Sequence, residues 1–463
     1  MAGSDLPYHF IYGDIPGHVL VAIDQELSYK PVGYDRTDSY LNGTWDGRVQ
    51  LFRQSRRGGS WYFASGLLSR VTNVLDIFGV PYTVRETPRQ EFDPQGFEWV
   101  SPFTLRSYQQ EVVDKVYAKG GGLISLPTGA GKTIIGLRLV QMFNVPTLIT
   151  VHTNELLYQW KDEIKRHLGV DCSLVGDGHK DFSAITVATL QTLGSMIRAG
   201  ELRRLEYGMF LMDECHRIGA DVAYSIAMRC TARIRVGLTA TAKRTDNADL
   251  KIFAATGPIT VNLTPCDLIR AGYLAKPRLT LVSVGGSPGF FSQSWAKEYV
   301  AQIVTNDERN EKIVDQVVRL VREGKQTYVH VERINHLELL YNAIAKEIGK
   351  ENVARIWGRV STKDRQRMLK QFKECKINVL VGTILKEGVD LPAMDAIVLA
   401  GGLSSPVALV QKVGRVLRRN ERFDYAEIID FIDNCGRFCR KHSELRYQAF
   451  IEYYGDCIEI ETV

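Results

Sequence analysis

Short apolar runs alternate with amphipathic segments over most of this chain of 463 residues. In the first long series, between about residues 100 and 260, the apolar runs predict strands at 122–126, 147–151, 185–188, 209–213 and 234–238. A second series predicts strands at Thr327–Val331, Val379–Gly382, Ala396–Leu399 and Glu427–Ile432. The segments between these runs have helical spacing. Such alternation is typical of βαβ units, in which helices cover both faces of a parallel sheet.

The first 98 residues have a different pattern, in which Gly, Pro, Asp and Asn interrupt short apolar runs. The runs that suggest strands are His18–Ile23, Val49–Phe52 and Trp61–Phe63. We expect a small, β-rich α+β domain with a helix near Leu67–Phe78. The polar stretch Arg85–Gly96 contains two prolines and predicts a linker.

The length of the chain predicts several domains, because one hydrophobic core does not grow to this size. We expect an N-terminal domain at 1–98 and two α/β domains at 99–270 and 271–463, the last ending in a basic, aromatic helix at Arg437–Tyr454. No apolar run approaches the ~18 residues of a membrane span, and no secretory signal is visible. The eight cysteines form no C-x-x-C pair, which favours reduced thiols. A net charge of +5 is compatible with a nucleic-acid partner without requiring one.

The most specific motif is S-L-P-T-G-A-G-K-T at Ser125–Thr133, between a predicted strand and a predicted helix at Ile134–Phe143. Such a turn directs backbone N–H groups at one point beside the positive end of a helix dipole, which suits phosphate. Lys132 is expected to reach the terminal phosphates, and the Thr133 hydroxyl to hold Mg²⁺. The rest of the cradle is expected from Pro127, Thr128, Gly129, Ala130 and Gly131. The motif predicts a nucleoside triphosphate site; the alternative is a glycine turn beside a core lysine.

Two carboxylates, Asp213 and Glu214, follow the apolar run Met209–Met212. In an open parallel sheet, ligands bind at the carboxyl edge, where such a run ends. Asp213 is expected to hold Mg²⁺, and Glu214 to polarise the water that attacks the γ-phosphate. The alternative is a pair of surface acids at the end of a strand.

Through these motifs and those described next, residues 100 to 435 resemble a DExH-type helicase of superfamily 2. Leu105–Glu111 resembles the segment that reads adenine, with Gln109 at the base edge and Arg106 nearby. Asp213–His216 stands in place of the DExH box, and Leu238–Ala242 resembles the segment that couples hydrolysis to domain movement.

Two further segments lie in the second α/β half. Val381–Thr383 with Glu387–Asp390 resembles the segment that touches strand backbone and ribose, which makes Asp390 a nucleotide contact. Gln411–Arg418 resembles the arginine-finger segment, with Gln411, Arg415 and Arg418 as catalytic residues.

The resemblance implies two tandem RecA-like domains. The two arginines are three apart on a predicted helix, so they would share one face and stabilise the charge of the transferring phosphoryl group. The alternative is a solvated basic helix face.

By the same resemblance, the nucleic-acid strand is held by loops of both halves. The implied contacts are Val151–Thr153, Gln159, Trp160, Thr189–Thr192, Val331–Arg333 and Thr383. Hydroxyls, amides and helix N-termini hold phosphates without reading sequence. The alternatives are that the threonines cap helices and that Trp160 is a core residue.

The N-terminal domain contains Trp45-Asp46-Gly47-Arg48, followed by Arg53, Arg56 and Arg57. This stretch resembles the N-terminal domain of phage UvsW-type helicases, which unwind branched DNA. Arginines beside aromatic rings suit phosphate binding and base stacking, although Trp45 is equally compatible with a core position.

The implied protein is an ATP- and Mg²⁺-dependent DNA helicase or translocase acting on forks, displacement loops and four-way junctions in recombination, repair or replication. It is expected as a monomer or weak oligomer in the cytoplasm of a bacterium or a phage-infected host, with no membrane partner. The alternatives are an RNA helicase of the same superfamily and a non-enzymatic, nucleotide-gated DNA clamp.

The Arg418→Ala variant is expected to lose ATP hydrolysis, by a factor of about 10³–10⁵ in turnover, because an arginine finger stabilises charge only in the transition state. ATP binding should persist, as measured with a fluorescent nucleotide. Near-normal turnover would refute the assignment.

Overall fold

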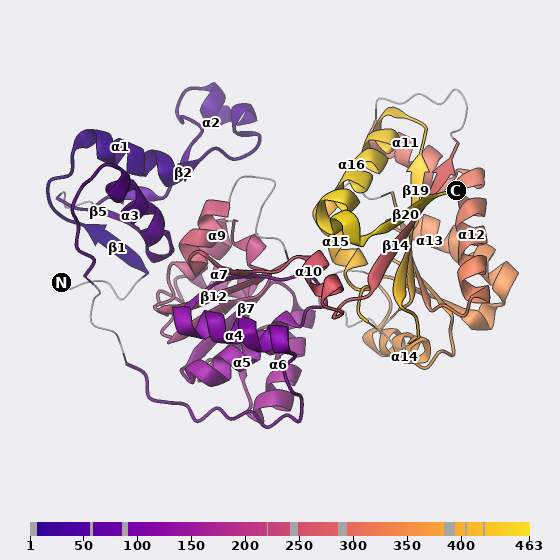
Figure 1. Cartoon of the computed structure of the whole chain (residues 1–463), viewed down its shortest axis with the longest axis horizontal. Helices are drawn as coiled ribbons and strands as arrows, with labels where there is room; N and C mark the ends of the chain where they lie inside the picture. The colour runs from indigo at the N-terminus through magenta and orange to yellow at the C-terminus, as the bar shows by residue number, and fades with distance from the viewer. Residues whose placement is uncertain are drawn as a thin grey trace. The chain divides into compact units, whose positions relative to one another are not determined.

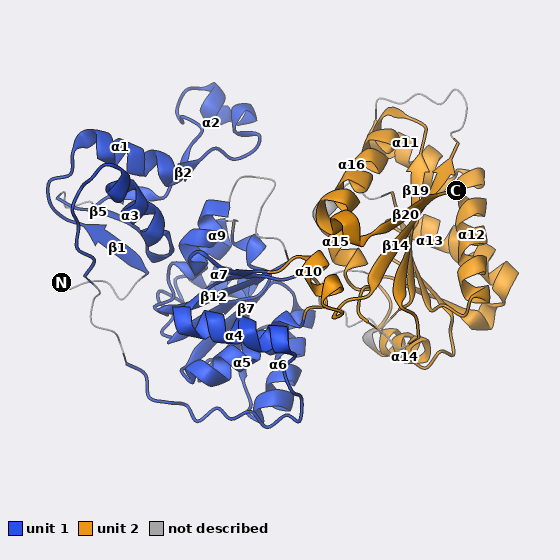
Figure 2. Cartoon of the chain, in the orientation of Figure 1, with its two compact units in different colours: residues 1–126, 131–262 blue, residues 127–130, 263–463 orange. Residues whose placement is uncertain are grey.

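The computed structural model describes residues 7–55, 59–85, 91–219, 221–240, 249–285, 294–383, 394–402, 405–419 and 422–463. The chain forms two compact units (Figure 2). The first comprises residues 1–126 and 131–262, and the second comprises residues 127–130 and 263–463. No helix in the described ranges combines the length and apolar character that crossing a bilayer requires.

The N-terminal part of the first unit is a small α+β module. Its strands are β1 (Tyr8–Ile11), β2 (Ser28–Tyr29), β3 (Val49–Gln50), β4 (Phe52–Gln54) and β5 (Trp61–Ala64). They form an antiparallel sheet of order β1-β5-β4 and a separate β2-β3 pair. The helices are α1 (Gly17–Glu26), α2 (Asp38–Leu41) and α3 (Leu68–Ile77).

The expectation of a strand at His18–Ile23 is wrong, because these residues lie in α1. The run is rich in Val and Ile, which favour strands. However, Val19, Ile23 and Leu27 are fully buried, whereas Val21 is 56% exposed. Burial at every fourth position is the pattern of a helix face, so tertiary packing overrides the local preference.

The main part of the first unit contains a sheet of order β13-β6-β12-β11-β7-β10-β8-β9 in the described residues. All its pairings are parallel except β8 with β9. The strands are β6 (Gly121–Ser125), β7 (Thr147–Val151), β8 (Ser173–Gly176), β9 (His179–Lys180), β10 (Ile185–Thr189), β11 (Met209–Met212), β12 (Ile234–Thr239) and β13 (Ile259–Asn262). The helices are α4 (Ser107–Lys119), α5 (Lys132–Phe143), α6 (Asn154–Leu168), α7 (Leu190–Arg198), α8 (Asp221–Ala227) and α9 (Asp249–Thr256).

The second unit contains a sheet of order β16-β17-β15-β18-β19-β14-β20, and all its pairings are parallel. The strands are β14 (Lys276–Val284), β15 (Thr327–His330), β16 (Val353–Ile356), β17 (Val379–Gly382), β18 (Ala396–Leu399), β19 (Tyr425–Asp433) and β20 (Glu459–Thr462). The helices are α10 (Pro265–Arg270), α11 (Trp295–Tyr299), α12 (Asp307–Arg322), α13 (Ile334–Ile348), α14 (Thr362–Lys373), α15 (Pro406–Val413) and α16 (Arg437–Tyr454).

Helices lie on both faces of each parallel sheet (Figure 1), as in RecA-like domains. The expected fold class is therefore confirmed: two α/β domains with parallel sheets and a small β-containing N-terminal region. Each strand predicted in the two α/β series overlaps an observed strand, and the helix predicted at Arg437–Tyr454 matches α16.

The N-terminal module and the first large sheet share one hydrophobic core. Val71 and Val74 of α3 belong to the same buried cluster as Ile252 and Ala255 of α9. At Gly66, in the turn before α3, an added Cβ would clash with the carbonyl oxygen of Phe253 and come within 2.8 Å of that of Ala254. The close approach requires glycine, because the obstructing atoms are backbone atoms and cannot rotate away.

The Gly66→Ala variant is expected to lower the free energy of unfolding by about 1–3 kcal/mol, as overpacking of a tight contact does. Urea denaturation followed by circular dichroism measures the change. Gly17→Ala is the control, because nothing lies within 4 Å of a Cβ at Gly17. Equal midpoints for Gly66→Ala and the wild type would contradict the packing argument.

Candidate nucleotide site

The predicted phosphate-binding loop leaves β6 at Ser125 and enters α5 at Lys132. Gly129 and Gly131 have φ angles of +88° and +78°, in the left-handed region that favours glycine. Lys132 Nζ donates a hydrogen bond to the carbonyl oxygen of Leu126 at 3.2 Å, so the side chain folds back along its own loop. The local geometry is that of a loop whose backbone N–H groups and ammonium group can surround a phosphate.

The predicted adenine-reading residue Gln109 lies against this loop. Its side chain is buried, and its Oε1 accepts a hydrogen bond from the backbone N–H of Arg106 at 3.0 Å. A Cβ on Gly131 would lie 2.5 Å from Gln109 Nε2, so Gly131 is needed for this approach. Gln109 thus links the start of α4 to the start of α5, whereas sequence motifs indicated only that both segments are present.

Asp213 and Glu214 follow β11 at the carboxyl edge of the first large sheet. Trp160 Nε1 donates a hydrogen bond to Asp213 Oδ2 at 2.9 Å, and the backbone N–H of Glu214 donates one to Asp213 Oδ1 at 3.0 Å. Burial and the charge of Glu214 raise the pKa of Asp213 to about 6, while the Trp160 hydrogen bond and the charge of Lys132 oppose this rise. The influence of Lys132 ties the acidic pair to the phosphate-binding loop.

Strand pairing explains why residues so far apart in the chain meet. Ser125 of β6 is in register with Thr239 of β12, and Met212 of β11 is in register with Gly237 of β12. The parallel strands therefore deliver the phosphate-binding loop, the acidic pair and Thr239 to the same edge. Carboxylate and hydroxyl oxygens are suitable Mg²⁺ ligands, so Asp213 and Thr133 fit the metal predicted for them.

His216 connects the acidic pair to β12, a contact that sequence reasoning did not find. Its Nδ1 lies 3.3 Å from Glu214 Oε2 and 3.3 Å from Thr239 Oγ1. The two segments were named separately as motifs, but their contact depends on the register of β11 and β12. In the segment Leu238–Ala242, which is predicted to couple hydrolysis to domain movement, Thr241 and Ala242 lie outside the described residues.

The arginine-finger segment belongs to the second unit and departs from the expected helix. Because α15 ends at Val413, Arg415 and Arg418 do not share a helix face, and that expectation is wrong. The chain turns after the helix, and Arg418 forms an antiparallel bridge with Leu274. The helix therefore ends before both arginines, and Arg418 pairs with a residue far away in the chain.

Gln411 lies on α15, and its Nε2 atom is buried with no hydrogen-bond partner in the described part of the chain. A buried donor of this kind is costly unless a ligand satisfies it. Asp390, the predicted ribose contact, lies outside the described residues, as does the segment Glu387–Val389.

Several implied strand contacts have structural roles. Trp160 is 1% exposed, so its ring is not available to a base. The hydroxyls of Thr153 and Thr189 accept hydrogen bonds from the backbone N–H groups of Leu156 and Thr192, so both threonines cap helices.

Two family models match the chain: "Type III restriction enzyme, res subunit" over residues 102–244 and "Helicase conserved C-terminal domain" over residues 308–420. The DNA 3'-5' helicase XPB of Kineococcus radiotolerans is 29% identical over 333 residues, covering 68% of this chain and 57% of the relative. The chain therefore spans little more than half the length of that relative.

A second similar protein is the ATP-dependent DNA helicase uvsW of Enterobacteria phage T4. It is 23% identical over 445 residues, covering 89% of this chain and 86% of the relative. Among solved structures, a fragment of a putative HsdR subunit of a type I restriction enzyme from Vibrio vulnificus has a TM-score of 0.58 at 18% identity. It covers 94% of this chain and 83% of that chain, and shows the shared fold.

The Trp160→Phe variant is expected to raise the pKa of Asp213, because the lost indole hydrogen bond stabilises the carboxylate. Asp213 must be ionised to hold Mg²⁺, so kcat/KM for ATP should fall as the pH drops through about 6, and at a higher pH in the variant. At acid pH, kcat/KM of the variant should be lower than that of the wild type by a factor of about ten or more.

The measurement is the pH profile of kcat/KM for ATP hydrolysis. Trp99→Phe is the control, because the Trp99 indole donates to the Phe103 carbonyl instead, at 3.1 Å. The assignment fails if both variants have the acid limb of the wild type.

Proposed function

We propose that this chain, a superfamily 2 helicase that resembles phage UvsW, uses ATP hydrolysis to remodel branched DNA such as forks, displacement loops and four-way junctions. As a helicase it is an ATP-dependent enzyme. The observation that carries the proposal is the meeting of Lys132, Asp213 and Gln109 at one sheet edge, since this set can grip a nucleotide at both its phosphate and its base. Recombination, repair or replication is the process we infer for it.

The site residues at the carboxyl edge of the first large sheet have distinct proposed roles in hydrolysis. The loop and Lys132 bind the phosphates, and Thr133 with Asp213 would hold Mg²⁺, which neutralises charge on the phosphate oxygens when bound. Glu214 orients the attacking water and accepts its proton. His216 contacts both Glu214 and Thr239, so a change in the charge of Glu214 would be transmitted to Thr239 through the imidazole.

The second unit is proposed to complete the chemistry. Arg415 and Arg418 would supply positive charge to the transferring phosphoryl group, and Gln411 a hydrogen bond from its buried Nε2. Supplying these groups from a separate unit makes hydrolysis depend on closure of the two units, which couples the chemistry to movement along DNA.

The choice of branched DNA rests on the N-terminal module. A groove of about 920 Å³ is lined there by Trp45, Arg48, Arg53 and Trp61, among others. Trp61 stacks on Phe52 with ring centroids 4.8 Å apart, and Trp45 donates a hydrogen bond to the Arg48 carbonyl at 2.8 Å. Trp45 is therefore a groove residue and not part of the core. Aromatic and guanidinium groups in one groove suit a nucleic-acid strand.

The extent of similarity also favours this substrate. The match to uvsW covers 89% of the chain, whereas the match to XPB covers 68%. Arg56 and Arg57, the other predicted basic residues, lie outside the described residues.

The decisive experiment compares ATP-driven strand separation on a linear duplex, a fork, a four-way junction and an RNA duplex. We expect the fork and the junction to be processed fastest. The Arg48→Ala/Arg53→Ala variant should bind the fork more weakly and reduce the slope of log K against log salt by about 2, roughly one per lost phosphate contact.

Lys119→Ala is the matched control, since this exposed cation ends α4 where the chain enters the amino end of β6. Preference for the RNA duplex would make the protein an RNA helicase. Absence of hydrolysis with every DNA would make it a nucleotide-gated clamp, and equal rates on linear and branched DNA would remove the proposed selectivity.

A further inference from the structure

A pocket of about 450 Å³ opens at the carboxyl edge of the second sheet. Two loops that follow neighbouring strands line this pocket. They contribute Glu332 and Arg333 after β15, and Gly401 and Gly402 after β18. The remaining lining comes from Trp295, Tyr299, Ser405, Ala408 and Lys412. Its volume is in the range of small-ligand sites, so one nucleobase fits.

The aromatic side of the pocket is formed by α11. The Trp295 ring meets Tyr299 and His442 edge-on, with centroids 5.1 and 4.3 Å apart, and Phe438 at a tilt of 59°. None of these contacts in the described residues is a stack. Trp295 is only partly buried and lines the pocket, so the part of the indole that borders the pocket can meet a planar ligand.

Helix α11 is held rigidly in spite of its short length. The buried carboxylate of Glu298 accepts hydrogen bonds from the backbone N–H groups of Phe438 and Cys439, at 2.8 and 2.7 Å, at the start of α16. The Tyr299 hydroxyl donates to the Gly401 carbonyl at 3.0 Å. The pocket is thus pre-formed, which reduces the entropy lost on binding.

The floor depends on two glycines. A Cβ on Gly401 would lie 3.1 Å from the backbone nitrogen of Glu332, and Gly402 has a φ angle of +58°. The preceding residue, Ala400, accepts a hydrogen bond from Arg309 Nη1 at 2.7 Å. This hydrogen bond fixes the backbone just before the two glycines to the buried interior of the unit.

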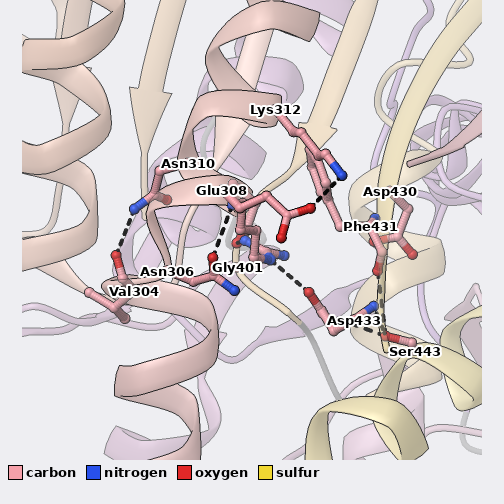
Figure 3. A network of polar contacts seen from close by, with 12 residues as sticks. Val304, Asn306, Glu308, Asn310, Lys312, Gly401, Asp430, Phe431, Asp433 and Ser443 are labelled. Carbon is pink, nitrogen blue, oxygen red and sulfur yellow. Dashed lines mark hydrogen bonds and ion pairs between the residues drawn. The ribbon is translucent and has the colours of Figure 1, made fainter. Parts of the chain in front are cut away.

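Arg309 is itself held in a network of buried ions. Its Nε donates to Asp433 at 2.7 Å, and Arg446 pairs with Asp430 at 2.8 Å. Figure 3 shows Asp430, Asp433 and Ser443 of this network. The Ser443 hydroxyl accepts a hydrogen bond from the backbone N–H of Asp433 at 3.1 Å. Both arginines and Asp433 are no more than 1% exposed, so the network is protected from water and salt.

Among the described residues that line the pocket, Glu332 and Lys412 neutralise each other, whereas Arg333 is exposed. Lys412 Nζ lies 3.0 Å from Glu332 and 2.7 Å from His330. Burial opposes the ionisation of Glu332, but His330 and Lys412 outweigh it and lower its pKa to about 2, so this carboxylate is compensated. Arg333 is exposed, lies over the Tyr299 ring at 5.7 Å, and has no ion pair among the described residues.

We infer that this pocket receives one unpaired base of the DNA strand, with Trp295 stacking on the base and Arg333 binding an adjacent phosphate. The inference rests on the proposed function, because it assumes that the second unit contacts DNA. An aromatic ring beside a guanidinium is the arrangement by which proteins hold unpaired bases regardless of sequence. The pocket would thereby distinguish a strand with bases from a bare sugar–phosphate backbone.

The test compares oligothymidylate with an abasic strand of the same length, by fluorescence anisotropy on the full chain. The wild type should bind the base-bearing strand more tightly. Trp295→Ala should reduce the ratio of the two affinities by a factor of about 5 to 150, the range for the loss of one stacked base. Trp295→Phe should retain most of it, and Arg333→Ala should weaken binding to both strands.

Tyr447→Ala is the matched control, an aromatic residue 40% exposed on α16 that does not line the pocket. Arg333→Ala carries the test if Trp295→Ala does not fold. The inference is overturned if Trp295→Ala keeps the full advantage of the base-bearing strand, or if Arg333→Ala binds both strands as the wild type does. The proposed function fails differently, when no DNA binds the wild type or stimulates its ATP hydrolysis.

Discussion

Parallel strand pairing is the constraint on which both sites depend. Each parallel strand ends at the same edge of its sheet, so the segments that follow neighbouring strands converge whatever their distance along the chain. In the first large sheet, β6, β12 and β11 deliver the predicted phosphate-binding loop, Thr239 and Asp213 in this way. In the second unit, β15 and β18 deliver the two loops that form the aromatic pocket.

Burial then gives charged groups different roles in the two units. Burial and the neighbouring Glu214 raise the proton affinity of Asp213 into the range where it can change state, although the indole donor opposes the rise. Arg309 and Arg446 are buried with paired carboxylates, and they position backbone without changing state. Removing one member of such a pair would leave an uncompensated charge in the interior.

The central strands of the two parallel sheets could be predicted from the sequence because buried parallel strands are continuous apolar runs. Three features could not, and β8, β9, β13, β16 and β20, which lie toward the sheet edges, were not predicted either. The run His18–Ile23 has strand-like composition, yet its burial is helical. Helix α15 ends at Val413, and Arg418 pairs instead with Leu274, far away in the chain. Strand β14 contains polar residues at Lys276, Arg278, Thr280 and Ser283, which interrupt the apolar run. Motifs named the nucleotide residues, but the Trp160–Asp213 and His216–Thr239 contacts depend on register between separate strands.

The shared core of the N-terminal module and α9 has a consequence for how such a protein can be inherited. If the module were lost, the apolar residues of α9 beside the first large sheet would be exposed to water. If the first large sheet and its helices were lost, the apolar residues of α3 would be exposed. The two are therefore not interchangeable cassettes. Exchange of the whole module would break the interior that both parts have in common, unless the new module kept the apolar contacts between α3 and α9.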